Sequence, residues 1–353
     1  MDITEILRSA VKMGVSDVFI IAGLPVSFKK NGEIINYDSE VFMPHDTTSF
    51  ISEMYLMADD RKMEKLLTQG DDDFSSAIPT LSRFRVSAYK QRGSLAAVVR
   101  VIALELPIYT NLNIPESVMS IADFNNGLVL VTGPAASGKS TTLSCVIDRV
   151  NKTKSFHIVT LEDPIEYLHK HKKSIVTQRE ISLDTTSYVV ALMAALRQSP
   201  DVILLGEMRD GDTISTAVTA AETGHFVIST LHTIGASNTI DRIIDAFPEN
   251  QQSQIRIQLS MVLRAIVSQQ LIPAIGGGLV PAFEIMFVNS AIRNMIRESK
   301  IHQIDNTIFS SGGENMTSMD TSIYNLYEDK KITAENAINY STNKKMMEKK
   351  ING

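Results

Sequence analysis

An eight-residue loop near the middle of the chain limits the possible folds more than any other feature. The segment Gly133–Ser140 reads Gly-Pro-Ala-Ala-Ser-Gly-Lys-Ser and matches the pattern GxxxxGK[ST]. The apolar stretch 128–132 precedes it and a helical run, 141–150, follows it, as the pattern requires. Glycines let successive backbone N–H groups face phosphate oxygens, and the helix dipole favours negative charge there. The segment therefore predicts a strand–loop–helix unit that holds the phosphates of a nucleotide.

Each part of this loop has an expected role in binding ATP and Mg²⁺. Lys139 reaches the β- and γ-phosphates, and the Ser140 hydroxyl ligates Mg²⁺. The predicted nucleotide-binding set is Gly133, Pro134, Ala135, Ala136, Ser137, Gly138, Lys139, Ser140 and Thr141.

The region around the loop has the pattern of a parallel sheet. Four short, wholly apolar stretches alternate with helical segments: Leu128–Thr132, His157–Leu161, Val202–Leu205 and Phe226–Thr230. Strands buried on both faces read this way, so this region is predicted to be α/β. We expect helices from about 250 to 340.

The first hundred residues form a different, α+β pattern. A helix is expected at 3–13 and helical structure at 45–68. Strands are expected at Val18–Ala22, Phe84–Tyr89 and Ala96–Ile102, and Asn31-Gly32 predicts a hairpin between two further strands.

These patterns divide the chain into four parts. We predict an N-terminal α+β domain at 1–103, a linker or hinge at 104–115 and an ATPase domain at 116–340. The tail, 341–353, carries four lysines with little to bury, so it is expected to be mobile.

Carboxylates follow two of the apolar strands. Glu162 comes directly after the strand at 157–161, and Glu207 follows Val-Ile-Leu-Leu-Gly at 202–206. Ligands of such sheets lie at the carboxyl ends of the strands, and ATP hydrolysis needs carboxylates for Mg²⁺ and for the attacking water. Both are candidates, although Glu162 could be a solvated loop acid. Asp163 and Glu166 could instead cap a following helix.

Two histidines bracket the strand at 226–230. Seven extended residues span about 23 Å, so His225 and His232 cannot contact the same phosphate. We favour His232, at the carboxyl end, as the sensor of the γ-phosphate. His225 could be a hydrogen-bonded loop histidine.

Arginines in the first domain form another candidate group. Alternation puts Arg83 and Arg85 on one face of a strand, and Arg92 follows shortly after. They could stabilise phosphate charge within the chain or from a neighbour, or they could form a solvated basic face.

The composition of the chain argues against some classes of protein. The net charge of −6 disfavours a nucleic-acid motor, although a local basic patch could exist. The single cysteine, Cys145, allows no internal disulfide and suits a reducing cytosol. We see no signal peptide, and no apolar run approaches the roughly 20 residues that span a bilayer.

The chemistry-bearing segments together resemble those of the ATPases of type IV pilus and type II secretion systems. Four boxes occur in the family's order: the loop 133–140, an aspartate box at 161–166, a Walker B strand ending in Gly-Glu at 202–207, and a histidine box at 223–233. The segment Ala291–Glu298, Ala-Ile-Arg-Asn-Met-Ile-Arg-Glu, is similar to the signature helix of the pilus retraction ATPases. By spacing alone this segment is an amphipathic packing helix.

The resemblance implies a hexameric motor with a PAS-like first domain and a RecA-like second domain. It implies that Glu207 organises Mg²⁺, that Glu162 is the general base, and that Arg83, Arg85 and Arg92 close over ATP. The implied partner is a polytopic inner-membrane platform protein, with the motor cytoplasmic and peripheral to that membrane and no DNA or RNA bound. Extension or secretion motors, a nucleic-acid translocase, and a nucleotide-gated assembly factor with little turnover remain alternatives.

The chain departs from the family pattern at two places. Ala135-Ala136 replace Thr-Gly, and a left-handed conformation at Ala136 is costly for a residue with a Cβ. We expect a slightly different loop conformation or altered turnover, with binding retained. Ser199 replaces a common acidic residue, which bears on Mg²⁺ or interface chemistry.

Overall fold

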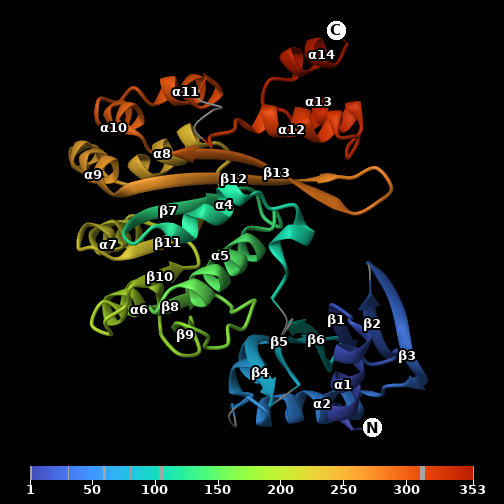
Figure 1. Ribbon diagram of the computed structural model, residues 1–353. Coiled ribbons are helices and arrows are strands. Elements are labelled where there is room, and N and C mark those ends of the chain that lie inside the picture. The colour runs from blue at the N-terminus through green and yellow to red at the C-terminus, as the bar shows by residue number, and fades with distance from the viewer. Residues whose placement is uncertain are drawn as a thin grey trace. The chain divides into compact units, whose positions relative to one another are not determined.

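The chain folds into two compact units, each with its own sheet and core (Figure 1). The computed structural model describes residues 2–30, 32–58, 61–79, 81–102, 106–310 and 315–352. By their contacts, unit 1 contains Met1–Glu105 and Glu166–Leu168, and unit 2 contains Leu106–Ile165 and His169–Gly353. Leu104 and Glu105 of the predicted linker lie outside the described residues.

Unit 1 is a six-stranded antiparallel sheet with helices. Its elements are α1 (Ile3–Met13), β1 (Asp17–Ile20), β2 (Pro25–Lys30), β3 (Glu33–Val41), α2 (Pro44–Leu56), α3 (Glu64–Gln69), β4 (Asp71–Ile78), β5 (Ser82–Gln91) and β6 (Ser94–Ile102). The strand order is β3-β2-β1-β6-β5-β4. The helix predicted at 3–13 is confirmed: the Asp2 carboxylate caps it, and Gly14, with φ 65°, ends it.

The hairpin predicted at Asn31-Gly32 joins two strands that do pair. β2 and β3 run antiparallel, with Lys30 opposite Glu33, while Asn31 itself lies outside the described residues. β4 was not predicted, because it begins with three consecutive aspartates, which are uncommon in strands.

Unit 2 contains a seven-stranded sheet. Its strands are β7 (Gly127–Thr132), β8 (His157–Glu162), β9 (Ile175–Glu180), β10 (Val202–Leu205), β11 (Phe226–Leu231), β12 (Leu263–Pro273) and β13 (Leu279–Phe287). Its α-helices are α4 (Glu116–Met119), α5 (Lys139–Thr153), α6 (Tyr188–Ala195), α7 (Gly211–Glu222), α8 (Ala236–Asp245), α9 (Glu249–Val262), α10 (Ser290–Arg297), α11 (Ile304–Ser310), α12 (Met319–Glu328), α13 (Ala334–Tyr340) and α14 (Lys344–Asn352).

The order of this sheet is β13-β12-β7-β11-β10-β8-β9, parallel throughout except that β12 and β13 are antiparallel. Alternate residues of β7 supply two cores: Leu128 and Leu130 belong to one, Val129 and Val131 to the other. The predicted parallel sheet, covered on both faces, is therefore confirmed, and so are its four predicted strands.

Two expectations for the C-terminal part are wrong. Residues 263–287 form the hairpin β12–β13 and not helices, because both strands are buried against the sheet and the C-terminal helices. The tail 341–353 does have something to bury. Its α14 buries Met347 to 3% exposure in a small core with residues of β12, β13, α12 and α13. Among the described residues, none of the helices has the length and hydrophobicity that a bilayer crossing requires.

Candidate nucleotide site

The phosphate loop follows β7 directly and ends in α5, as its sequence predicts. Gly133 has φ 142°, and Gly138, with φ 86°, is the N-cap of α5. A Cβ on Gly133 would lie 2.2 Å from the Gln269 carbonyl oxygen, so only glycine fits at this position. Lys139 Nζ donates to the carbonyl oxygens of Gly133 at 2.8 Å and Pro134 at 2.9 Å. These bonds fold the lysine over its own loop, where phosphate oxygens could replace the carbonyls.

Ala136 takes the left-handed conformation that its Cβ disfavours. Its φ is 60°, so the loop does not avoid this conformation, which costs roughly 1–2 kcal/mol in a non-glycine residue. Ala136 is exposed, and its Cβ therefore meets solvent. The expected change of loop conformation is not found at this residue.

The loop contains a buried hydroxyl group that could donate a hydrogen bond to an anion. Ser137 Oγ is buried and has no hydrogen-bond partner among the described residues, and it would lie 2.8 Å from a Cβ on Gly133. A buried hydroxyl without a partner is costly, and a phosphate oxygen would satisfy it. Ser140 is exposed at the start of α5, where its hydroxyl is accessible to a metal ion. These residues fit a nucleotide phosphate with a bound Mg²⁺.

Gln269 of β12 supports the loop from the adjacent strand, and the sequence analysis missed it. Its Oε1 accepts a hydrogen bond of 2.7 Å from Thr142 Oγ1 on the first turn of α5. The preceding residue, Ser268, bonds Thr132 Oγ1 at 2.9 Å and the Gly235 N–H at 2.8 Å. The polar residues Ser268 and Gln269 directly after the apolar Ala265–Val267 were the available signal, since a buried polar side chain needs a partner.

Hydrogen bonds join the carboxyl ends of neighbouring strands at this edge. The Gly206 N–H donates to the Leu161 carbonyl at 2.8 Å, and Thr230 Oγ1 donates to the Gly206 carbonyl at 2.6 Å. The Gly133 N–H donates to the Leu231 carbonyl at 3.3 Å. Glu162, Glu207 and His232 therefore lie at the same edge of the sheet as the phosphate loop.

Glu207 lies at the centre of these side chains. Its side chain is 12% exposed, and its Oε1 pairs with Arg209 Nη2. His232 Nε2 lies 3.4 Å from Oε2, which is buried and accepts no hydrogen bond within the part of the chain that the structure describes. Hydrogen bonding to Glu207 raises the pKa of Arg209 above its usual value. A carboxylate with an unsatisfied oxygen here is suited to bind a hydrated cation.

Glu162 is not a freely solvated loop acid. Thr160 Oγ1 donates to its Oε1 at 2.6 Å, and Gln178 Nε2 donates to the same oxygen at 3.2 Å. Tyr188 stands nearby, and burial, together with the charges of Asp163 and Glu207, raises the pKa of its hydroxyl. No helix lies between β8 and β9 among the described residues, so Asp163 and Glu166 do not cap one.

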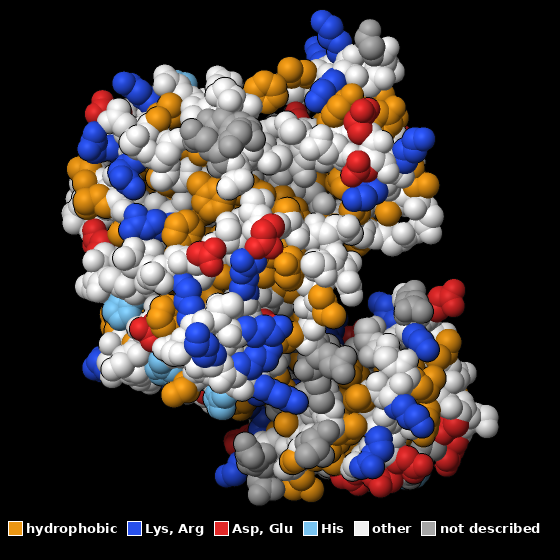
Figure 2. All heavy atoms as spheres, viewed as in Figure 1, with side chains coloured by type: hydrophobic (Ala, Val, Ile, Leu, Met, Phe, Trp, Pro, Cys, Tyr) orange, Lys and Arg blue, Asp and Glu red, His pale blue; other side chains and the backbone are white. Residues whose placement is uncertain are grey.

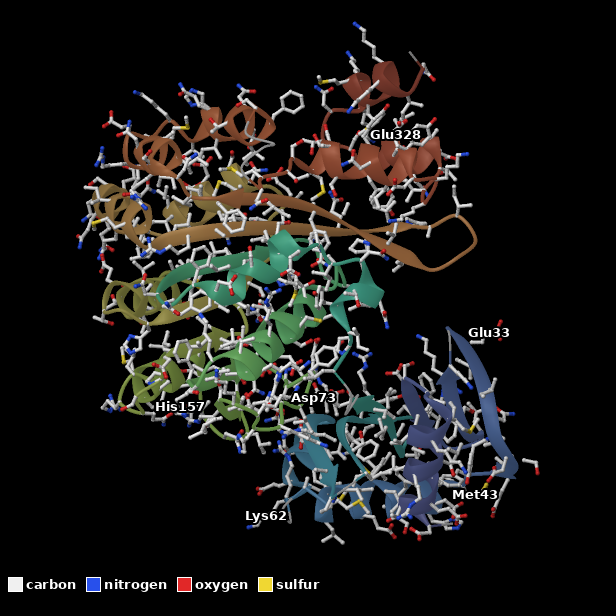
Figure 3. The ribbon with its side chains drawn as sticks, in the orientation of Figure 1. Glu33, Met43, Lys62, Asp73, His157 and Glu328 are labelled. Atoms are coloured by element: carbon white, nitrogen blue, oxygen red, sulfur yellow. The ribbon has the colours of Figure 1, made fainter. Side chains whose placement is uncertain are left out.

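Two other residues lie at the opposite edge of the sheet. His225 precedes β11, and its Nδ1 lies 3.0 Å from the Ala220 carbonyl and 3.2 Å from Thr223 Oγ1. It has the contacts of a hydrogen-bonded loop histidine. Ser199 precedes β10, with φ 52°, and therefore lies at the edge of the sheet opposite the phosphate loop. Figure 3 labels His157, which begins β8 at this same edge.

The three arginines of unit 1 do not form one group. Arg83 and Arg85 share a face of β5, while Phe84 and Val86 are buried on the other face. Arg92, with φ 46°, lies in the turn after β5, seven residues beyond Arg85, which is about 23 Å of extended chain. The three therefore cannot contact one phosphate together.

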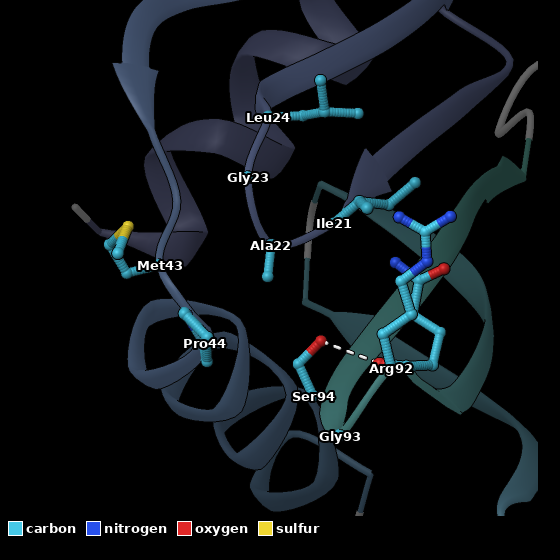
Figure 4. A pocket seen from close by; sticks show the side chains of 10 residues that line it. Ile21, Ala22, Gly23, Leu24, Met43, Pro44, Arg92, Gly93 and Ser94 are labelled. Atoms are coloured by element: carbon cyan, nitrogen blue, oxygen red, sulfur yellow. Dashed lines mark hydrogen bonds between the residues drawn. The ribbon is translucent and has the colours of Figure 1, made fainter.

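Arg92 lines an open pocket of about 700 Å³ within unit 1 (Figure 4). The turn that carries it is held by a hydrogen bond of 3.0 Å from Ser94 Oγ to the Gln91 carbonyl. The other wall consists of residues 21–24 with Met43 and Pro44. The exposed guanidinium can thus meet an anion from outside the unit.

Lysine and arginine side chains gather over α5 and the loop between β8 and β9 (Figure 2). Lys152 and Lys172 both pair with the Asp148 carboxylate, which neutralises part of this charge. Lys170 and Lys173 are exposed. A local basic patch does exist within the net charge of −6.

Three comparisons find the same type of protein. A family model described as Type II/IV secretion system protein matches residues 1–283. The chain is 42% identical over 337 residues to the Type IV pilus retractation ATPase PilT of Pseudomonas aeruginosa, covering 96% of this chain and 97% of that one. It is 45% identical over 276 residues to the twitching motility protein of Neisseria gonorrhoeae, covering 78% and 74%. The crystal structure of the pilus retraction motor PilT with bound ADP has a TM-score of 0.91 at 45% identity, with 99% of both chains covered.

Proposed function

The chain belongs to the type II/IV secretion system protein family, and from that premise we propose that it is an ATP-hydrolysing motor that retracts type IV pili. One observation carries the proposal: the similarity to a retraction ATPase extends over nearly the whole of both chains. The phosphate loop, two carboxylates and a histidine at one edge of the sheet supply the chemistry that such a motor requires.

Each residue at this edge is assigned a role in hydrolysis. The N–H groups of the loop and Lys139 hold the phosphates. Glu162, oriented by its two donors, accepts a proton from the attacking water as general base. His232 detects the γ-phosphate, and its contact with Glu207 links that detection to the metal-binding carboxylate.

Ser140 and Glu207 are the residues that would hold Mg²⁺, directly or through its waters. The ion would neutralise charge on the transferred phosphoryl group. Arg209 pairs with the Glu207 carboxylate and would help to hold it in place beside the ion.

We assign the arginines of unit 1 to ATP as well, in two separate places. Arg83 and Arg85 share one face and could act on the same phosphates, whereas Arg92 would act elsewhere, within its own subunit or on a neighbour's nucleotide. Domain boundaries at 1–103, 104–115 and 116–340 remain our proposal, with 341–353 packed on the C-terminal helices of the ATPase domain. In it, 104–115 is the hinge and the first domain is PAS-like.

The working assembly would be a homohexamer at the cytoplasmic face of the inner membrane. Its partner would be the polytopic platform protein of the pilus, and hydrolysis would change the angle between the two domains of each subunit. Pilins would then leave the base of the fibre.

Two alternatives keep specific support. The left-handed Ala136 in the phosphate loop makes a nucleotide-gated assembly factor with little turnover worth testing. The basic patch near α5 makes a nucleic-acid translocase testable, since DNA affinity would then be strong and would fall steeply with salt. A pilus-extension or secretion motor would share all of the hydrolysis chemistry.

The experiment is ATP turnover by purified protein with Mg²⁺, beside Glu207→Gln. We expect wild-type turnover and a loss of about a hundredfold or more in the variant. Tight ATP binding with negligible wild-type turnover would instead favour the assembly factor.

A further inference from the structure

The side chain of Gln178 contacts two groups. One is the carboxylate of Glu162, the proposed general base, and the other is the backbone N–H of His169 in the loop that follows β8. Gln178 Nε2 donates to Glu162 Oε1 at 3.2 Å, and its Oε1 accepts from the His169 N–H at 2.7 Å. A backbone N–H can only donate, so the atom facing His169 must be the amide oxygen. The His169 contact therefore fixes the amide with its N–H₂ towards Glu162.

The parallel pairing of β8 and β9 explains this geometry. Gln178 is the register partner of Thr160, and Glu162 lies two residues beyond Thr160 on the same face of β8. Thr160 and Gln178 thus both donate to Glu162 Oε1, one from its own strand and one from the neighbour. Because the last torsion of a glutamate is soft, two donors on one oxygen restrict the rotation of the carboxylate.

We propose that Gln178 is a positioning residue for ATP hydrolysis: it holds the Glu162 carboxylate in the orientation that accepts the proton of the attacking water. The inference rests on the proposed role of Glu162. Gln178 acts through Glu162 and not on ATP, so its loss should slow turnover without weakening binding. A shift of about 1 Å in a catalytic group can cost about a hundredfold in rate.

Gln178→Glu is the discriminating variant. It keeps the shape of the side chain and an oxygen for the His169 N–H, but it replaces the donor facing Glu162 with a second carboxylate oxygen. We expect kcat to fall about 10- to 100-fold while KM for ATP stays within about twofold. Gln178→Met, which removes both contacts, should likewise lower kcat and leave KM for ATP nearly unchanged.

Gln258 offers a matched control on the protein surface. Its Nε2 donates to Glu222 Oε2 at 2.9 Å, so Gln258→Glu makes the same chemical change beside another carboxylate. Its turnover should equal that of wild type. Thermal unfolding of every variant separates slow turnover from loss of fold.

Each outcome has one meaning when Glu162→Gln is measured in parallel. If Glu162→Gln is inactive while folded Gln178→Glu has wild-type kcat, the inference about Gln178 is overturned and the role of Glu162 stands. A rise in KM at unchanged kcat overturns it equally. If Glu162→Gln retains wild-type turnover, the proposed role of Glu162 fails, and the inference about Gln178 fails with it.

Discussion

Thr142 on the first turn of α5 donates a buried hydrogen bond of 2.7 Å to Gln269 on β12. The Gln269 backbone carbonyl is also the group that excludes a side chain from Gly133, and its amide lies against Gly138. One residue of the neighbouring strand therefore contacts both ends of the phosphate loop.

Gln269→Met should destabilise the protein and weaken nucleotide binding. It leaves the buried Thr142 hydroxyl without a partner, which costs about 1–3 kcal/mol. Thr142→Val should cost a similar amount, while the double variant should cost less than the sum, because neither polar group then remains. Urea unfolding and titration with a fluorescent ATP analogue measure the two effects; additive losses would contradict the direct contact.

Gly206→Ala should reduce ATP turnover by displacing the end of β10. The new Cβ would lie 2.8 Å from Tyr188 Oη and 3.2 Å from the Leu161 carbonyl, so Glu207, one residue on, must move. We expect a loss of about tenfold or more in kcat. Adding Tyr188→Phe removes the closer atom and should recover part of the rate. If Gly206→Ala turns over ATP like wild type, this close packing does not set the position of Glu207.

His232→Ala should lower kcat with little change in ATP affinity. His232 lies 3.4 Å from Glu207 at the phosphate edge, so its loss affects the step that follows binding. His225→Ala is the control, because His225 lies at the other end of β11, bonded to the Ala220 carbonyl. Equal losses in both variants would show that the histidines act through the stability of β11.

The buried Asp72 of unit 1 should make stability fall in acid. Burial alone would raise the pKa of Asp72, but hydrogen bonds from Arg61, Lys65 and Tyr55 outweigh it and lower that pKa. A lowered carboxyl pKa gives stability that is present above the unfolded-state pKa and lost as pH falls through the folded-state value. Asp72→Asn should cost about 2–4 kcal/mol at neutral pH, with the difference from wild type shrinking below about pH 4.

The control for Asp72→Asn is Glu298→Gln, which breaks an exposed contact of 4.0 Å with Lys300. It should change the free energy of unfolding little at any pH. An Asp72→Asn difference that stays constant down to pH 3 would mean that Asp72 does not titrate with folding.

The sequence predicted the parts of the fold that local pattern determines. The four central strands of unit 2 are short apolar runs, and the phosphate loop has a fixed spacing, so both could be read directly. β4 and β12 could not, because an acidic edge strand and a strand containing Ser268 and Gln269 depend on tertiary partners.

The sequence predicted which residues follow the strands at the site, but it did not predict which side chains contact one another. Residues that follow a strand, such as Glu207 and His232, were found because parallel strands end at one edge. Gln178 was missed, since a single glutamine in a strand gives no signal until its partner is known. Gln269 was missed because the polar residues in its segment were not read as buried. The large distance between Arg85 and Arg92 could be recognised only once the structure showed that β5 is continuous over this stretch.

The most direct test of the motor proposal is to follow pilus retraction in living cells. Labelled pili would be imaged in a strain lacking this protein and complemented with wild type or Glu207→Gln. We predict that wild type restores retraction, while the deletion and Glu207→Gln leave cells with extended pili that do not shorten. Normal retraction in the deletion strain, or a loss of pili altogether, would contradict the assignment as a retraction motor.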